Sequence, residues 1–184
     1  MALHALLQGY RGYADTQALG ETLKALQAAG LDQLPLPGSG QTLERFSRLA
    51  QVAGHDLRLC KLFEGHTDAL AVIAQLRSPL PPEGSIWGMW AAEPPTARVR
   101  ARRNGHRLLL EGRKAWCSGA AVVSHGLLTA WDEEDRQQLV AVDMGQPGIT
   151  VTDEGWHAVG MATTGSVDIL FAGATAIAVG GPGD

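Results

Sequence analysis

A proline-rich break at residues 78–84 separates two parts of the chain that differ in their hydrophobic pattern. Its prolines lack backbone N–H groups, so a helix that reaches this segment cannot continue through it. Before the break, apolar residues recur every three or four positions, which is the spacing of amphipathic helices. After it, turn residues separate short apolar runs about every ten positions, which is typical of a β-barrel or β-sandwich. We therefore predict an α+β fold, with an N-terminal helical domain over residues 1–80 and an antiparallel β domain over residues 84–180.

The helical part contains one long periodic stretch that begins at Thr42 and is expected to form two segments around Gly54. Its first segment places Leu43 and Phe46 on one apolar side. The second segment has a wider apolar stripe that includes His66, so we expect it to be largely buried.

The strongest hairpin signal in the second part is Asn104-Gly105, which lies between the predicted strands 98–103 and 107–111. The first of these strands alternates arginines with small apolar residues, which predicts a half-exposed strand with a solvated basic face. Further strands are predicted over residues 86–92, 122–131, 138–142, 149–152, 166–171 and 176–179.

Charge and composition exclude several classes of function. The net charge of −4 offers no basic surface for nucleic acid. No apolar run reaches the ~18 residues that a membrane span requires. Cys60 and Cys117 form no C-x-x-C pair and are expected to be buried residues of a reducing compartment. With no signal peptide apparent, we expect a cytoplasmic protein.

The histidines and hydroxyls predict neither a metal site nor a nucleophile. His55 and His66 lie eleven residues apart on the expected helix, which is too far to share one metal ion. Ser124 and His125 are neighbours in a predicted strand and should therefore point to opposite faces. We accordingly expect no metal and no serine–histidine pair.

The candidate binding site is the stretch at residues 112–119, where a polar turn leads into Trp116. If this stretch ends a strand, Trp116 and Ser118 share one face. The result is a flat aromatic surface beside a hydroxyl, which suits a planar hydrogen-bonding ring such as an isoalloxazine. The alternative is a tryptophan buried in the core, as most strand tryptophans are.

Several short motifs follow one another in order across residues 42–184. They are Glu93-Pro94, the run from Gly112 through Lys114 and Trp116-Cys117 to Ser118, Gly148-Ile149, Gly160-Met161 and the TGSVDILF segment at residues 164–171. Behind a helical part, this order resembles the N-terminal helical and middle β domains of the acyl-CoA dehydrogenase family. The family's C-terminal helical domain has no counterpart here, and residues 181–184 are expected to begin a linker to it.

The resemblance implies a flavoprotein oxidoreductase of fatty acid metabolism that uses FAD. In such enzymes a hydride passes from an acyl-CoA-like small molecule to flavin N5. Trp116 would lie against the ring, and Ser118 would donate a hydrogen bond near N5. The positions implied to bind the cofactor are Met89, Ala91, Ala92, Trp116, Cys117 and Ser118. The family's catalytic base and most of its oligomer interface lie in the C-terminal domain. No catalytic residue is therefore assigned in this chain, and a homo-oligomer is expected only with that domain present.

The sequence also departs from the family pattern. Ala92 stands at a position where the family has a threonine that contacts the flavin, and the loop that follows Glu93-Pro94 is deleted. Because that loop helps to hold acyl-CoA, two alternatives stay open: a flavin-dependent monooxygenase-like variant, and a relative that binds a ligand or partner without catalysis. Glu93, the nearest carboxylate to the proposed ring, is interpreted as a structural residue at a strand end.

Overall fold

The computed structural model describes residues 2–79, 81–157 and 159–183, and its helices precede its strands, as predicted. The expected domain and linker ranges also include Met1, Leu80, Ala158 and Asp184, which lie outside the described residues. The helices are α1 (Ala2–Leu7), α2 (Thr16–Ala28), α3 (Thr42–His55) and α4 (Leu57–Gln75). The strands are β1 (Trp87–Trp90), β2 (Val99–Asn104), β3 (Arg107–Cys117), β4 (His125–Trp131), β5 (Gln137–Asp143), β6 (Ile149–Gly155) and β7 (Val167–Val179), with a short 3₁₀ helix η1 (Ala162–Thr164) before β7.

Helices α3 and α4 meet at Asp56, which ends the first helix and begins the second. Its backbone N–H bonds to the carbonyl of Val52 at 3.0 Å. Its carboxylate accepts from the N–H groups of Arg58 and Leu59 at 2.8 and 3.2 Å. The carboxylate thereby satisfies donors at the start of α4 that have no partner within the helix. The predicted interruption therefore exists, but it lies at the capping residue Asp56 and not at Gly54.

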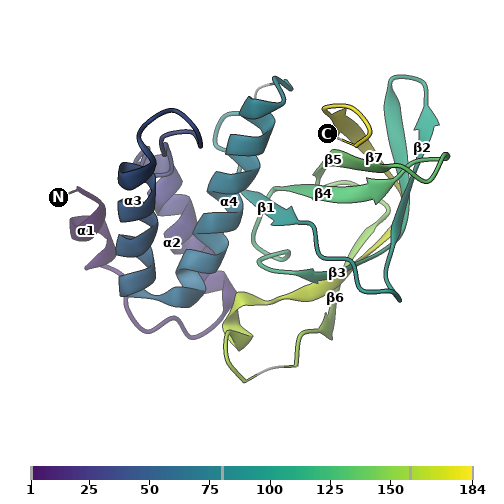
Figure 1. The fold of residues 1–184 in the computed structure, drawn as a ribbon. Helices are drawn as coiled ribbons and strands as arrows, with labels where there is room; N and C mark the ends of the chain where they lie inside the picture. Colours follow the sequence, from purple (N-terminus) through teal and green to yellow (C-terminus); the bar gives the residue numbers. More distant parts are fainter. Residues whose placement is uncertain (1, 80, 158, 184) are drawn as a thin grey trace.

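The apolar sides of α3 and α4 differ in burial. Helix α4 lies between the other helices and the barrel (Figure 1), and Phe63 and His66 on it are completely buried. On α3, by contrast, Leu43 is 81% exposed and Phe46 is 61% exposed, so these two residues of the predicted apolar side face outward, whereas Leu49 packs against the core. In the described chain, no helix is both long and apolar enough to cross a membrane.

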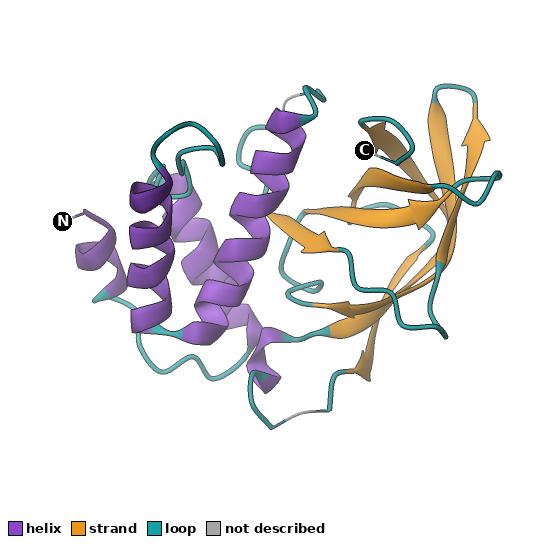
Figure 2. Ribbon diagram, in the orientation of Figure 1, coloured by secondary structure: helices purple, strands orange, loops and turns teal. Residues whose placement is uncertain are grey.

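The strands form a sheet that closes on itself as a barrel, beside the helices (Figure 2). Around the barrel, β2, β3, β7, β5 and β4 pair in succession, and β4 returns to β2 through Arg100 and Trp131. Most pairs are antiparallel, as predicted, but β1 and β2 both run parallel to β4. Parallel neighbours need a crossover connection, and the β2–β3 hairpin provides it between β1 and β4.

The turns explain where the predicted strands are right and where they are wrong. The Asn104-Gly105 hairpin is confirmed, and Gly105 takes a φ of 63° in the turn. The predicted strands at 166–171 and 176–179 are one strand, β7. Gly173, which resembles a turn residue in the sequence, has a φ of 80° next to a shift in the β3–β7 register. The glycine thus bends the strand at a β-bulge and does not end it.

One hydrophobic core continues from the helices into the barrel. It joins buried residues of α2 and α4 to buried residues of β3 and β7, among them Leu23, Phe63, Leu110 and Ile169. One close approach is at Gly20 of α2, where an added Cβ would lie 2.6 Å from the Cβ of Val122. The glycine therefore allows α2 to lie directly against the segment between β3 and β4.

Candidate functional site

A β-bulge at the end of β3 turns Trp116 out of the barrel. The register between β3 and β7 shifts between Lys114 and Cys117, and Trp116 has a φ of 60°. This left-handed conformation is uncommon for a residue other than glycine, so it needs a local cause. The result is an indole that is 42% exposed at the barrel rim, whereas most strand tryptophans are buried.

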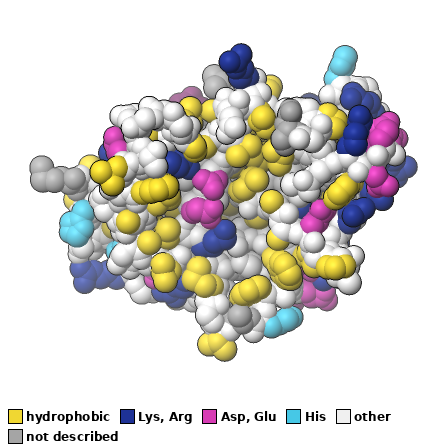
Figure 3. Space-filling view, viewed as in Figure 1, with side chains coloured by type: hydrophobic (Ala, Val, Ile, Leu, Met, Phe, Trp, Pro, Cys, Tyr) yellow, Lys and Arg dark blue, Asp and Glu magenta, His cyan; other side chains and the backbone are white. Residues whose placement is uncertain are grey.

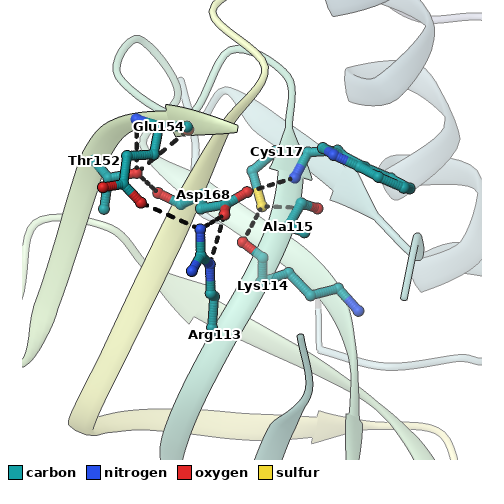
Figure 4. Close-up of polar contacts among 8 residues, drawn as sticks. Arg113, Lys114, Ala115, Cys117, Thr152, Glu154 and Asp168 are labelled. Atoms are coloured by element: carbon teal, nitrogen blue, oxygen red, sulfur yellow. Dashed lines mark hydrogen bonds and ion pairs between the residues drawn. The ribbon is translucent and has the colours of Figure 1, made fainter. Parts of the chain in front are cut away.

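Asp168 of β7 holds the bulge in place. Its side chain is 5% exposed, and Oδ1 accepts from the backbone N–H of Trp116 at 3.2 Å. Oδ2 accepts from Nε of Arg113 at 2.5 Å, and the same guanidinium pairs with Glu154 at 3.3 Å (Figure 4). A buried carboxylate is costly unless it is paired, and here a guanidinium and a backbone N–H pair it. The sequence indicates no role for Asp168, although it lies in the 164–171 motif.

The exposed indole borders a cavity of about 460 Å³ between α4 and the barrel rim. Five of the six predicted cofactor-binding residues line this cavity: Met89, Ala91, Ala92, Trp116 and Ser118. The sixth, Cys117, does not reach it, because its buried thiol faces the carbonyls of Lys114 and Ala115 at 3.4 and 3.7 Å (Figure 4). Burial raises the pKa of the Cys117 thiol, so the sulfur stays protonated at neutral pH.

A chain of hydroxyl groups fixes the direction in which Ser118 hydrogen-bonds. Thr164 donates to the carbonyl of Met161 at 2.7 Å. The hydroxyls of Thr164 and Ser166 lie 2.9 Å apart, and those of Ser166 and Ser118 lie 2.7 Å apart. Because each hydroxyl has one proton and the carbonyl only accepts, Ser118 donates to Ser166 when all three bonds form. Ser118 therefore offers the cavity an acceptor, which differs from the donor that the resemblance implies.

Trp90 forms another part of the cavity wall and connects it to the barrel. It is 3% exposed, and its Nε1 donates to the backbone carbonyl of Ser118 at 3.1 Å. A Cβ added at Gly88 of β1 or at Gly126 of β4 would overlap its ring. The two glycines thus leave the space that the indole occupies.

The cavity also contains residues that the sequence analysis does not single out. Trp156, after β6, meets Trp116 edge to face, with ring centroids 6.3 Å apart and planes at 83°. Lys61 and Glu64 of α4 form an ion pair at 2.9 Å, and Figure 3 shows acidic and basic side chains together over this helix. Burial raises the pKa of Glu64, although Lys61 acts in the opposite direction. Their spacing of three places both on one helical face, but nothing in the sequence indicates that this face meets the barrel rim.

Glu93 is held away from the cavity. Both of its carboxylate oxygens accept from Nε1 of Trp131, at 2.7 and 2.8 Å, and one lies 4.0 Å from Nζ of Lys114. These contacts agree with the interpretation of Glu93 as a structural residue at a strand end.

Ser124 and His125 differ from the sequence prediction. The hydroxyl of Ser124 lies 2.9 Å from Nδ1 of His125, because Ser124 precedes β4 and does not follow the alternation of the strand. The same hydroxyl also bonds the backbone N–H and carbonyl of Ile86, at 2.9 and 3.1 Å. It is therefore fixed to the backbone and is not a poised nucleophile. Across the described ranges, no cluster of three or more His, Cys, Asp or Glu residues could hold a metal ion.

The chain matches no protein-family model and no curated protein sequence. It is similar in structure to TdsC from Paenibacillus sp. A11-2 in complex with FMN and indole, with a TM-score of 0.74 and 22% identity over 98% of this chain and 52% of that one. It is similar to the methanesulfinate monooxygenase MsuC from Pseudomonas fluorescens, with a TM-score of 0.72 and 21% identity over 94% and 50% of the two chains.

A third similar structure is described as a putative acyl-CoA dehydrogenase from Mycobacterium smegmatis. Its TM-score is 0.75, and its identity is 15% over 98% of this chain and 57% of that one. The chain thus spans about half the length of the solved structures that it matches. At these low identities the likeness establishes the fold, which is the α+β fold of the acyl-CoA dehydrogenase-like flavin enzymes.

Proposed function

We propose that the cavity beside Trp116 binds the ring of a flavin, and that the chain is the ring-binding part of a flavin-dependent oxidoreductase. The observation that carries this proposal is the exposed indole, which a β-bulge turns out of the barrel toward a cavity that Ser118 also lines. Residues in such uncommon conformations cluster at ligand-binding sites.

The residues of the cavity suit such a ring. Trp116 offers a flat apolar surface, and the small side chains of Ala91 and Ala92 leave space beside it. Ser118 presents a hydroxyl oxygen that can accept a hydrogen bond from an N–H at the edge of the ring. Turning its proton toward the cavity would break one hydrogen bond, at a cost of about 0.5–1.5 kcal/mol.

A bound flavin supplies electron transfer to or from a substrate held against its ring. In this chain Trp116 would orient the ring, and Trp90 would keep the backbone of Ser118 in position. Glu64, whose pKa burial raises, could hold and release a proton at the α4 side of the same cavity.

The resemblance in the sequence implies FAD, whereas TdsC is described with FMN. Both cofactors carry the same ring, so the cavity serves either one. Two reactions fit: dehydrogenation of an acyl-CoA-like substrate, and oxygenation of a smaller one. The second is favoured by the connection after Glu93. There Ala97 N–H bonds the carbonyl of Pro94 at 3.0 Å, in a short turn that leads into β2, with no loop to hold a CoA group.

The proposal is tested by titrating the protein with riboflavin, FMN and FAD while following flavin fluorescence. We expect saturable but weak binding, since the chain supplies only part of the contacts found in the family. The variant Trp116→Ala should weaken binding by about fivefold to 150-fold, because stacking of a planar ring on an aromatic side chain contributes about 1–3 kcal/mol for nucleobases. Trp116→Phe should retain most of the binding.

The matched control is Trp131→Phe, since Trp131 contacts Glu93 and Arg98 and does not line the cavity. Equal flavin binding by the wild type and Trp116→Ala, or no saturable binding of any of the three flavins, would contradict the proposal. Anaerobic bleaching of the bound flavin by an acyl-CoA would favour the dehydrogenase over the oxygenase.

A further inference from the structure

Asp32, which follows α2, has a carboxylate oxygen that is buried without a partner. Within the described residues, its Oδ1 is the one buried side-chain oxygen or nitrogen that forms no hydrogen bond. The residue is 3% exposed. An unpaired oxygen on a buried carboxylate is expensive, and such groups in folded proteins are normally paired with protein groups, with ordered water or with a ligand.

The histidine beside Asp32 bonds only one of its two carboxylate oxygens. Nε2 of His66 lies 3.0 Å from Oδ2 of Asp32, and Nδ1 of His66 accepts from the backbone N–H of Trp87 at 3.2 Å. Because Nδ1 uses its lone pair as an acceptor, the ring carries its proton on Nε2 and donates it to Asp32. In this arrangement His66 donates one hydrogen bond to Oδ2 and leaves Oδ1 of Asp32 without a partner.

The other charged groups around the same cavity also leave Oδ1 of Asp32 without a partner. Arg45 is nearly buried, but its guanidinium bonds Asp68 at 2.8 Å and the carbonyls of Pro35 and Thr67 at 3.2 and 3.5 Å. Glu83 also lines the cavity and is negative. The surroundings therefore favour a positive group and disfavour an anion.

The cavity next to Asp32 has a volume of about 420 Å³ and mostly apolar walls. It lies between the turn after α2, the second half of α4 and the segment before β1, away from Trp116 and Ser118. Its apolar lining includes Leu34, Leu36, Leu70, Ile73, Pro81 and Pro82. We propose that this cavity binds a small organic cation, a protonated amine or amidine on an apolar body, whose N–H groups pair with Oδ1 of Asp32.

Entry of such a ligand requires a side-chain movement, because Oδ1 is closed to solvent in this structure. The exposed side chain that reaches the carboxylate is Gln33, whose Nε2 lies 3.5 Å from Oδ2 of Asp32. At this distance the contact is weak, so Gln33 can rotate aside at little cost. It also lines the cavity, so its rotation would open the Oδ2 side of the carboxylate, and a small turn of the Asp32 side chain would then present Oδ1 to the ligand.

The test uses benzylammonium chloride as the probe and benzyl alcohol as its uncharged counterpart. Binding to the wild-type protein is followed by NMR, through the Nε2–H signal of His66 that is bonded to Asp32. We expect saturable binding of benzylammonium and binding of the alcohol that is weaker by about tenfold or more, since a hydrogen bond between charged groups is about twice as strong as a neutral one. This comparison needs no variant.

A pair of variants then locates the charge. Asp32→Asn should weaken benzylammonium binding by about tenfold or more, whereas Glu21→Gln, which removes a carboxylate at an exposed position of α2 outside the cavity, should leave it nearly unchanged. The indole N–H signal of Trp116 separates any binding at the other cavity, so the result does not depend on the flavin proposal. Equal binding of amine and alcohol, no saturable binding, or a bound water at Oδ1 that the amine does not displace would overturn the inference.

Discussion

Lys114 carries an ammonium group into the interior of the barrel. Its side chain is completely buried, and Nζ donates to the carbonyl and the hydroxyl of Thr129 at 3.0 and 2.6 Å. Burial lowers the pKa of Lys114, and the nearby Glu93 acts in the opposite direction. Figure 4 shows Lys114 and Arg113 on opposite sides of β3. These neighbouring residues therefore point in different directions: Lys114 into the barrel and Arg113 toward Asp168.

The lowered pKa of Lys114 predicts a specific dependence of stability on pH. Between the folded pKa and the unfolded value near 10.5, the unfolded chain binds more protons than the folded one. The free energy of unfolding therefore rises with pH in this window, by about 1.4 kcal/mol for each unit of lowering. Lys114→Met lacks the titrating amine and therefore lacks this pH-dependent contribution to the free energy of unfolding. The stability of the wild type relative to Lys114→Met should thus be constant at lower pH and increase toward pH 10.5.

Urea unfolding of both proteins over this pH range measures the difference. Lys24→Met, which removes a lysine from an exposed position of α2, is the matched control. A constant difference between the wild type and Lys114→Met at every pH would show that burial does not shift the titration of Lys114.

Single residues differ in how far the sequence predicts them. Trp116 and Ser118 can be proposed as a pair, because a tryptophan, a small hydroxyl and a glycine follow a polar turn in a recognisable motif. Asp168 and Trp156 cannot, because their roles depend on long-range pairing of β3 with β7 and on the course of the loop after β6. Asp32 and His66 lie 34 positions apart, and only the tertiary structure brings them together.

Among the elements, the junction of α3 and α4 tests which residue ends a helix. Gly54 lies inside α3, and a Cβ added there would meet no atom within 4 Å. Gly54→Ala should therefore stabilise the protein by about 0.5–1 kcal/mol. Asp56→Ala should destabilise it by about 0.5–2 kcal/mol, because the first N–H groups of α4 lose their acceptor.

Asp56→Asn is the control, since asparagine keeps the capping oxygen and loses the charge and the second oxygen that accept from Arg58. Chemical denaturation, analysed with a common m-value, gives the change in the free energy of unfolding of each of the three variants relative to the wild type. A destabilising Gly54→Ala would indicate that the glycine, and not the capping carboxylate, interrupts the helical stretch.

The elements also show why strand boundaries are harder to predict than strand existence. The β2–β3 hairpin follows from Asn104-Gly105, since few other dipeptides adopt this turn. The start of β4 at His125 does not follow from the sequence, because Val122 and Val123 are suited to a strand but belong to the connection before it, where Val122 packs against Gly20 of α2. Tertiary contact thus decides the boundary that local propensity leaves open.

For the molecule as a whole, the shared core predicts that helices and barrel unfold together. All tryptophans of the chain lie at residue 87 or beyond, so indole fluorescence reports the barrel, whereas far-UV circular dichroism mainly reports the helices. Gly20→Ala should lower the free energy of unfolding by about 1–3 kcal/mol, because a Cβ there overlaps Val122. The decrease should be equal whether fluorescence or circular dichroism measures it.

Gly54→Ala should raise the free energy of unfolding by the same amount in both signals, although Gly54 lies on α3 and far from the barrel in sequence. Two separate transitions, or a variant that moves only one signal, would mean that the helical part and the barrel are independent folding units.

The indole of Trp90, which lies across Gly88 and Gly126, imposes a condition on how the neighbouring cavity could diverge in related proteins. Gly88 and Trp90 of β1 and Gly126 of β4 share one space between two adjacent strands. A larger side chain at one of these positions therefore requires a smaller one at another. A lineage that exchanged Trp90 for a smaller residue would release both glycines at once. Side chains at these positions of β1 and β4 could then change the shape of the cavity beside Ser118, while the β-bulge at Trp116 stayed intact.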